Sequence, residues 1–122
     1  MKTAQPAQYS QMALKLIYRA NIFVVNRIRP ALQMGRDDSN DIVVVSLFAS
    51  RIHARVQERD GQFVLTDLSS NGTFLLVDDD TSERRLRGEE AVLAGRGWLG
   101  LGKSAALHGD HSVRFALEAE TA

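Results

Sequence analysis

Polar residues gather in clusters between apolar runs, each at a place where the chain is expected to turn. The clusters that hold candidate binding residues are Gly35-Arg36, Ser50-Arg51-Ile52-His53 and Ser69-Ser70-Asn71-Gly72-Thr73. Arginine presents a planar fork of donors that can meet two oxygens of one anion, and serine and asparagine supply neutral donors beside it. Such residues on neighbouring loops of a β scaffold predict a site that grips an anionic group.

The composition excludes several classes of function. The chain has 122 residues, of which 44% are hydrophobic, which suits one domain with a real core. Its 15 basic residues balance 15 acidic ones, so a broad basic surface for nucleic acid or for a membrane is not expected. It has no cysteine, which excludes disulfides, thiol catalysis and cysteine zinc sites. The apolar stretch from Met12 to Val25 is interrupted by charged residues, so it predicts neither a signal peptide nor a membrane helix, and a cytoplasmic protein is expected.

Short β-prone runs separated by turn residues predict an all-β protein. The clearest local structure is a hairpin at Asp60-Gly61, which pairs Val56 with Leu65 on the core face and Arg55 with Thr66 on the other face. About eleven such runs favour an antiparallel β-sandwich that spans residues 12–117, with an arm at 1–11 and a tail at 118–122. A helix over residues 81–94 is the alternative for that segment, although Gly88 in its middle would weaken it.

The order of these clusters resembles the forkhead-associated (FHA) domain, a module that binds phosphothreonine peptides. The resemblance also includes Asn40-Asp41-Ile42 between the first two clusters, and it is strong over about forty residues. It implies a binding module that is not an enzyme and that uses no cofactor or metal. The expected partner is a phosphothreonine-containing protein or peptide, such as a Ser/Thr kinase or its substrate. A weaker resemblance, on residues 85–90, to FHA modules of bacterial nucleotide cyclases implies a linked cyclase domain and phosphate-independent docking as the alternative.

The resemblance also implies a role for each matching residue. Arg36 and Ser50 would bind the phosphate with help from Arg51 and Ser70, and Asn71 would hold the main chain of the ligand. Structural support would come from four residues at turns and behind the loops: Gly35, His53, Gly72 and Thr73. Leu47 and Phe48, in an unusually apolar loop, would select an apolar ligand residue three positions after the phosphothreonine. Arg36 taken alone would instead suit a surface ion pair with Asp37 or Asp38.

Other sequence patterns predict different chemistry but lack the context that each requires. Residues 97–104 match the P-loop pattern, but His108-Gly109-Asp110 would stop the helix that must follow it. Residues 95–100 match the dinucleotide fingerprint without a surrounding βαβ unit. Ser50 and His53 could suggest a catalytic pair with Asp67, but nothing indicates an oxyanion hole. His108 and His111 with Asp110 are expected to form a solvated turn rather than a metal site.

Overall fold

The computed structural model describes residues 12–107 and 109–120. Strand β1 (Met12–Tyr18) shows why the chain forms sheets, because it buries Leu14, Leu16 and Tyr18 while Lys15 and Ile17 between them are half-buried. The remaining elements are β2 (Asn21–Val25), β3 (Ala31–Gly35), β4 (Ile42–Val43), β5 (Ala54–Arg59), β6 (Gln62–Asp67), β7 (Thr73–Val77), β8 (Arg84–Leu86), β9 (Glu90–Leu93), β10 (Arg96–Leu101), the 3₁₀ turn η1 (Ala105–Leu107) and β11 (Val113–Ala119). The same alternation recurs in β5 and in the first half of β11, whereas β6 and β10 bury consecutive residues.

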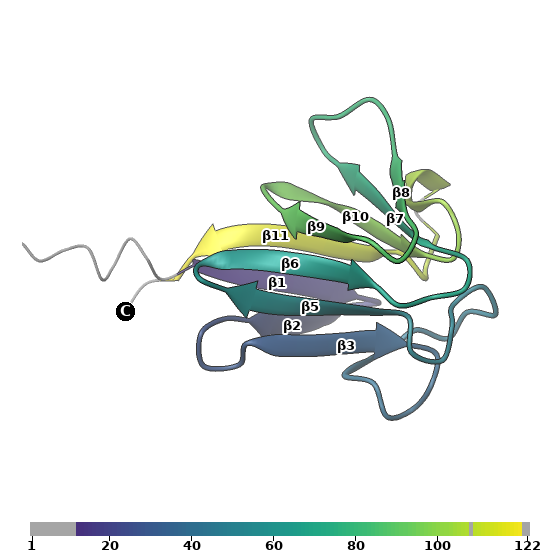
Figure 1. Cartoon of the computed structure of the whole chain (residues 1–122), viewed down its shortest axis with the longest axis horizontal. Helices are drawn as coiled ribbons and strands as arrows, with labels where there is room; N and C mark the ends of the chain where they lie inside the picture. Colours follow the sequence, from purple (N-terminus) through teal and green to yellow (C-terminus); the bar gives the residue numbers. More distant parts are fainter. Residues whose placement is uncertain (1–11, 108, 121–122) are drawn as a thin grey trace, which may run out of the picture.

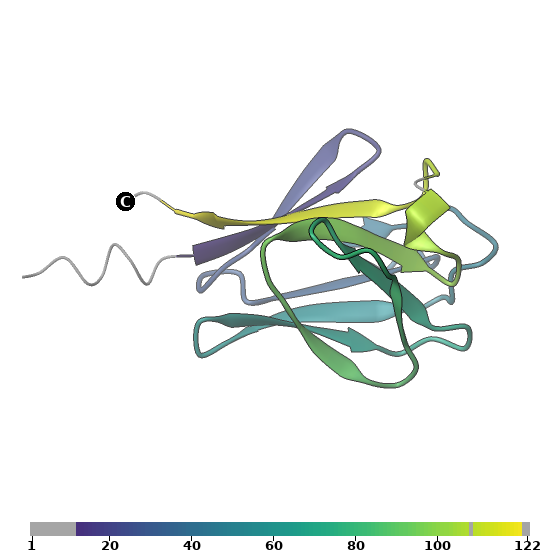
Figure 2. The ribbon, with the colours of Figure 1, turned by 90° about the horizontal axis from the view of Figure 1, so that it is seen from above.

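The strands form two sheets packed face to face, which Figure 2 shows as two layers. One sheet has the order β2-β1-β11-β10-β7-β8 and the other has the order β4-β3-β5-β6-β9. Large apolar side chains fill the space between the sheets, and Phe63, Phe115 and Met34 are at most 1% exposed. The expected β-sandwich of about eleven strands is therefore confirmed.

Several local expectations are also confirmed. The β5–β6 hairpin turns at Asp60 (φ 51°) and Gly61 (φ 86°), and it pairs Val56 with Leu65. After β10, which pairs in antiparallel fashion with β7 and β11, the described chain makes only the three-residue turn η1. This is not the strand–loop–helix arrangement that a P-loop requires. Among the described residues, no helix is long and apolar enough to cross a membrane.

Two details differ from expectation, and the alternative of a helix over residues 81–94 is excluded. The pair β3–β4 is parallel, while the other described pairs are antiparallel; β4 has only two residues and follows a loop that returns the chain to the edge of β3. Residues 81–94 contain β8 and β9 rather than a helix, because pairing with β7 and β6 outweighs local helix propensity. Strand β11 runs to Ala119, two residues into the segment assigned to the tail. The proposed N-terminal arm lies outside the described residues.

The two ends of the sandwich differ in what they present. Strand β1 begins and β11 ends at one end, where the β2–β3 and β5–β6 turns also lie (Figure 1). The loops that carry the polar clusters, residues 36–41, 44–53 and 68–72, meet at the other end (Figure 1). The topology thus brings together clusters that are far apart in the sequence.

Candidate anion-binding site

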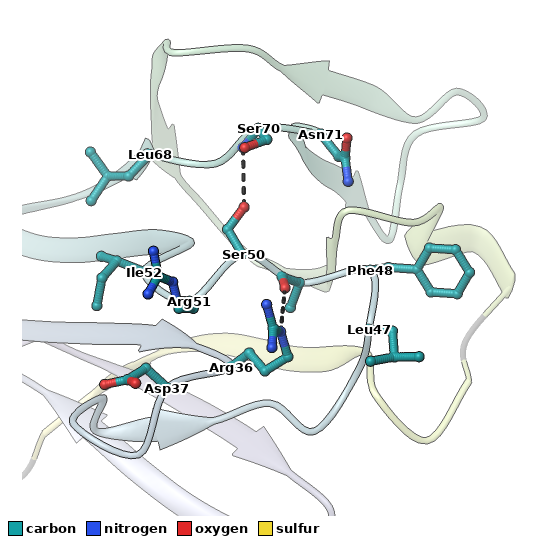
Figure 3. A pocket seen from close by; sticks show the side chains of 11 residues that line it. Arg36, Asp37, Leu47, Phe48, Ser50, Arg51, Ile52, Leu68, Ser70 and Asn71 are labelled. Carbon is teal, nitrogen blue, oxygen red and sulfur yellow. Dashed lines mark hydrogen bonds between the residues drawn. The ribbon is translucent and has the colours of Figure 1, made fainter.

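An open hollow of about 620 Å³ lies among these loops (Figure 3). It is lined by eleven residues from the three polar clusters and their neighbours: Arg36, Asp37, Leu47, Phe48, Ala49, Ser50, Arg51, Ile52, Leu68, Ser70 and Asn71. All five residues singled out for binding, and both residues singled out for selectivity, are in this set. The four expected support residues, Gly35, His53, Gly72 and Thr73, are buried and do not line the hollow.

The first wall of the hollow is the end of β3, which packs directly against the loop of Ser50 and Arg51. The Arg36 amide donates to the Ser50 carbonyl at 2.9 Å, and the Asp37 amide donates to the Arg51 carbonyl at 3.1 Å. A Cβ atom on Gly35 would lie 2.3 Å from the Arg51 carbonyl oxygen, so only glycine allows this approach. The close contact fixes the backbone on which Arg36 stands.

The Arg36 guanidinium is oriented by the same loop. Its Nε donates to the Ala49 carbonyl at 3.1 Å. Within the described part of the chain, neither terminal nitrogen of Arg36 has a hydrogen-bond partner, and no ion pair joins Arg36 to Asp37 or Asp38. A surface ion pair is therefore not the role that the structure gives this arginine. The two terminal nitrogens remain available to a bidentate anion.

Ser50 connects the second wall to the third. Its hydroxyl oxygen accepts the Ser70 amide at 3.1 Å, a link drawn in Figure 3. Because the oxygen is the acceptor in this bond, the hydroxyl proton is free to point toward a ligand in the hollow. The serine thus holds the Ser70 loop in place and offers a donor at the same time.

His53 braces these two loops from behind. The Ser50 amide donates to Nδ1 at 2.9 Å, and Nε2 lies 2.9 Å from the Gly72 carbonyl oxygen. Since Nδ1 accepts, Nε2 must carry the proton that is donated to Gly72, which defines a neutral tautomer. The side chain is fully buried, and this burial lowers the pKa of His53, although the bond to Gly72 and the charge of Asp67 oppose the shift. A neutral ring suits both bonds.

Asp67 organises the third wall, a role that the sequence analysis did not assign to it. One carboxylate oxygen accepts from the Ser69 hydroxyl at 2.6 Å and the Thr73 hydroxyl at 2.8 Å, and the other accepts from the Gly88 amide at 2.8 Å. Burial by itself raises the pKa of Asp67, but these hydrogen bonds outweigh burial and hold the pKa below its usual value. The Ser69 hydroxyl in turn accepts the Gly72 amide at 2.8 Å. The Asp-x-Ser spacing is the signal that could have revealed this turn.

Asn71 is held by its backbone rather than by its side chain. The guanidinium of Arg85, on β8, donates to the Asn71 carbonyl at 2.6 and 3.1 Å and lies 5.0 Å from the centroid of the Phe74 ring. The exposed Asn71 side chain lines the hollow (Figure 3). Arg85 is therefore a second supporting residue that the sequence analysis missed, and nothing in its local sequence pointed to this contact.

Both signs of charge occur around the hollow. Arg36 and Arg51 contribute two cations, and Asp37 contributes a carboxylate at the rim. Hydrogen bonds from the Ser39 hydroxyl and amide lower the pKa of Asp37, so it stays ionised near neutral pH. Behind it, the buried Asn40 amide group donates to the carbonyls of Asp37 and Arg51 at 2.8 and 2.7 Å. Two guanidinium groups, of which that of Arg36 is oriented by the Ala49 carbonyl, can together with serine and asparagine donors bind an anion of the size and charge of a phosphate monoester.

Comparison with known proteins identifies a matching family and solved structures of the same fold. The family model of the FHA domain matches residues 32–94, slightly more than half of the chain. Comparison with curated protein sequences gives no significant match.

Solved structures with the same fold come from bacteria and from a plant. FHA-1 of Mycobacterium tuberculosis Rv1747 superimposes with a TM-score of 0.67 at 18% identity, over 88% of this chain and 98% of that one. The FHA domain of an Arabidopsis thaliana hypothetical protein superimposes with a TM-score of 0.66 at 19% identity, over 99% of this chain and 97% of that one. M. tuberculosis EmbR in complex with a low-affinity phosphopeptide gives 0.64 at 26% identity, over 92% of this chain but only 26% of EmbR. Because the family model matches more than half of the chain and the chain forms two packed β-sheets, the chain belongs to the FHA domain family.

Proposed function

We propose that this chain is a binding module for phosphothreonine-containing peptides and proteins, and that the ligand phosphate occupies the hollow between the three loops. The proposal rests on the Arg36 guanidinium, whose terminal nitrogens have no partner among the described residues. This guanidinium is oriented by the Ala49 carbonyl and lines the same hollow as Ser50. A group held in this way loses little conformational freedom when it binds. The module has no catalytic role in this proposal.

The proposed contacts divide between the phosphate and the peptide backbone. A phosphothreonine carries about −1.5 to −2 charges and three acceptor oxygens. Arg36 meets two of these oxygens, Ser50 donates its hydroxyl proton to the third, and Arg51 and Ser70 add charge and polarity at the rim. Asn71 binds the ligand main chain, since a carboxamide can donate to a carbonyl and accept from an amide. Leu47 and Phe48 contact an apolar ligand residue three positions after the phosphothreonine.

The similarity to EmbR, whose solved structure holds a phosphopeptide, supports this assignment. One phosphate bound through charge-assisted hydrogen bonds suits micromolar affinity, about −8 kcal/mol. The module would act in the cytoplasm in bacterial Ser/Thr-kinase signalling, or as a regulator of an enzyme to which it is linked. Phosphate-independent docking, for example to a linked cyclase domain, is the alternative that the test below separates.

A degenerate peptide library tests the proposal. Wild-type protein and Arg36→Ala would be compared on the same library synthesised with phosphothreonine, phosphoserine or threonine. We expect selection of phosphothreonine peptides by the wild type and loss of that selection in Arg36→Ala. Equal retention of plain threonine peptides by a folded protein would refute phosphate recognition and favour phosphate-independent docking. A thermal melt of both proteins confirms that the variant is folded.

A further inference from the structure

Strand β2 forms one edge of the six-stranded sheet, and among the described strands it pairs only with β1. Its five residues, Asn21-Ile22-Phe23-Val24-Val25, include no charged residue and no proline. Natural proteins usually protect an exposed edge strand by a short length, by charged side chains or by proline, because its free N–H and C=O groups can pair with another chain. This edge has none of these three protections.

The other three sheet edges are shorter, and two of them carry charged side chains. At the opposite edge of the same sheet, β8 has three residues, two of which are Arg84 and Arg85. In the second sheet, β4 has two residues and β9 has four, of which the first is Glu90. The absence of these features at one edge of four indicates that β2 has a partner strand.

The β1–β2 turn determines which backbone groups of β2 point outward. Arg19 and Ala20 have φ of 49° and 73°, as in a two-residue type I′ turn. The residues that flank such a turn exchange hydrogen bonds, and bonded and non-bonded pairs then alternate along an antiparallel ladder. The first, third and fifth residues of β2 therefore bond to β1. The N–H and C=O groups of Ile22 and Val24 point away from β1.

The side chains along this edge are apolar on both faces of the sheet. On the outer face, Ile22 is 61% exposed and Val24 is 37% exposed, and Ile22 lies opposite the half-buried Ile17 of β1. On the inner face, Phe23 is half-buried and packs against the core. The tip of the β1–β2 hairpin stands clear of the other strands (Figure 2). A partner strand would therefore meet free backbone groups and apolar side chains together.

We propose that the partner is β2 of a second copy of this chain, which pairs in antiparallel direction about a two-fold axis at Phe23. Because the outward backbone groups belong to Ile22 and Val24, Ile22 of each copy lies opposite Val24 of the other. Each of these two pairs exchanges both of its N–H···O=C bonds, and the two Phe23 residues face each other as a non-bonded pair. No charged side chain of β2 meets its own counterpart, so the strand suits pairing with itself.

Such a contact closes on itself. It uses the β2 edges of both copies, so neither is left to add a third copy. The joined sheet then ends in β8 on both sides, where Arg84 and Arg85 oppose further pairing. Because the paired strands run in opposite directions, the loops that form the phosphate hollow point in opposite directions in the two copies. With the proposed function, the dimer would hold two phosphopeptides at its two ends.

Sedimentation velocity of the full chain over a range of concentrations measures this association. Val24→Pro removes an outward N–H that β1 does not use, and proline is tolerated on the free side of an edge strand. Ile22→Lys adds the charge that protects natural edge strands. Val92→Lys makes the same change on the edge strand β9 of the other sheet, where Val92 is 51% exposed, and is the matched control. Thermal melts confirm that the variants are folded.

We expect the wild type and Val92→Lys to form dimers, and no larger species, as the concentration rises. The dimer Kd should rise at least about tenfold in Val24→Pro and in Ile22→Lys, because the two-fold axis applies each change twice. A wild type that remains monomeric at about 1 mM, or one that assembles beyond a dimer, would overturn the proposal. Dimerisation of both edge variants with the wild-type Kd would also overturn it.

A disulfide test reports the register, because the chain has no cysteine of its own. Opposed residues of a non-bonded antiparallel pair have Cα atoms about 4.5 Å apart, which is within the range of a disulfide. Under mild oxidation, Phe23→Cys should form a linked dimer at least about ten times faster than Val92→Cys, and equal rates would contradict the two-fold axis at Phe23. Neither assay contains a phosphopeptide, so failure here leaves the proposed function standing, and failure of phosphothreonine selection leaves this dimer standing.

Discussion

His53 is the residue whose replacement tests the architecture of the site most sharply. His53→Ala would leave the Ser50 amide and the Gly72 carbonyl without the partners they now have at 2.9 Å, and it would open a cavity at a fully buried position. An unsatisfied buried polar group costs about 1–3 kcal/mol, and the cavity adds to this. Water can reach the half-buried Ser50 and replace one of the two lost partners. We therefore expect the free energy of unfolding to fall by about 3–5 kcal/mol in total.

Urea denaturation measures this loss directly. His53→Gln provides an internal comparison, because its side-chain amide can still donate to Gly72 while the acceptor for Ser50 is gone. We expect its free energy of unfolding to fall by roughly half as much as that of His53→Ala. A change below about 1 kcal/mol in His53→Ala would refute the role of His53 as a brace between the loops.

The same brace gives the stability of the protein a pH dependence. Burial lowers the pKa of His53 below the 6.5 of an unperturbed histidine, so the unfolded chain binds this proton more readily than the folded protein. The His53 contribution is therefore complete above pH 6.5 and declines as the pH falls from there toward the lowered pKa, by at most about 1.4 kcal/mol per pH unit. The difference between wild type and His53→Gln, measured from about pH 8 to about pH 5, isolates this slope from that of the other histidines. A difference that does not vary with pH would contradict a neutral, buried His53.

Three further substitutions probe the loops. Gly35→Ala should destabilise the protein by about 3 kcal/mol in urea denaturation, because its Cβ atom would meet the Arg51 carbonyl oxygen at 2.3 Å; Gly109→Ala, with open space around it, is the matched control. Asp67→Ala should cost about 3–5 kcal/mol by the same assay, because it removes a buried carboxylate that accepts from the Ser69 and Thr73 hydroxyls and the Gly88 amide; a loss below about 1 kcal/mol would show that water replaces it. Ser50→Ala should weaken phosphothreonine-peptide binding about 10- to 100-fold in calorimetry and leave affinity for the unphosphorylated peptide unchanged. Equal weakening for both peptides would contradict a hydroxyl contact to phosphate.

Features set by a few adjacent residues were predictable from the sequence. Asp60-Gly61 requires positive φ at two successive positions, and this alone fixes the β5–β6 turn and its register. The polar loop clusters were recognisable because their residue types and order are unusual. Their arrival at one end of the sandwich follows from the antiparallel pairing of β5 with β3 and with β6.

Features that depend on distant parts of the chain were not predictable. Strand β8 has three residues and owes its existence to pairing with β7, which no local pattern shows. Arg85 reaches the Asn71 carbonyl only because that pairing brings β8 beside the loop. The Asp67 carboxylate accepts hydrogen bonds from both Ser69 and Gly88, and Gly88 lies 21 positions after Asp67 in the sequence. Long-range pairing thus supplies the support of the site, while local sequence supplies its functional groups.

A titration followed by NMR would test the central claim most directly. A capped phosphothreonine peptide and its threonine counterpart would be added to ¹⁵N-labelled protein while the Arg36 Nε–H and the Ser50 and Ser70 amides are observed. We expect saturable shifts at all three groups with the phosphopeptide and none with the threonine peptide. Unchanged signals from these groups at saturating phosphopeptide, or shifts confined to the β5–β6 and β2–β3 turns at the opposite end, would contradict phosphate binding by Arg36 and Ser50.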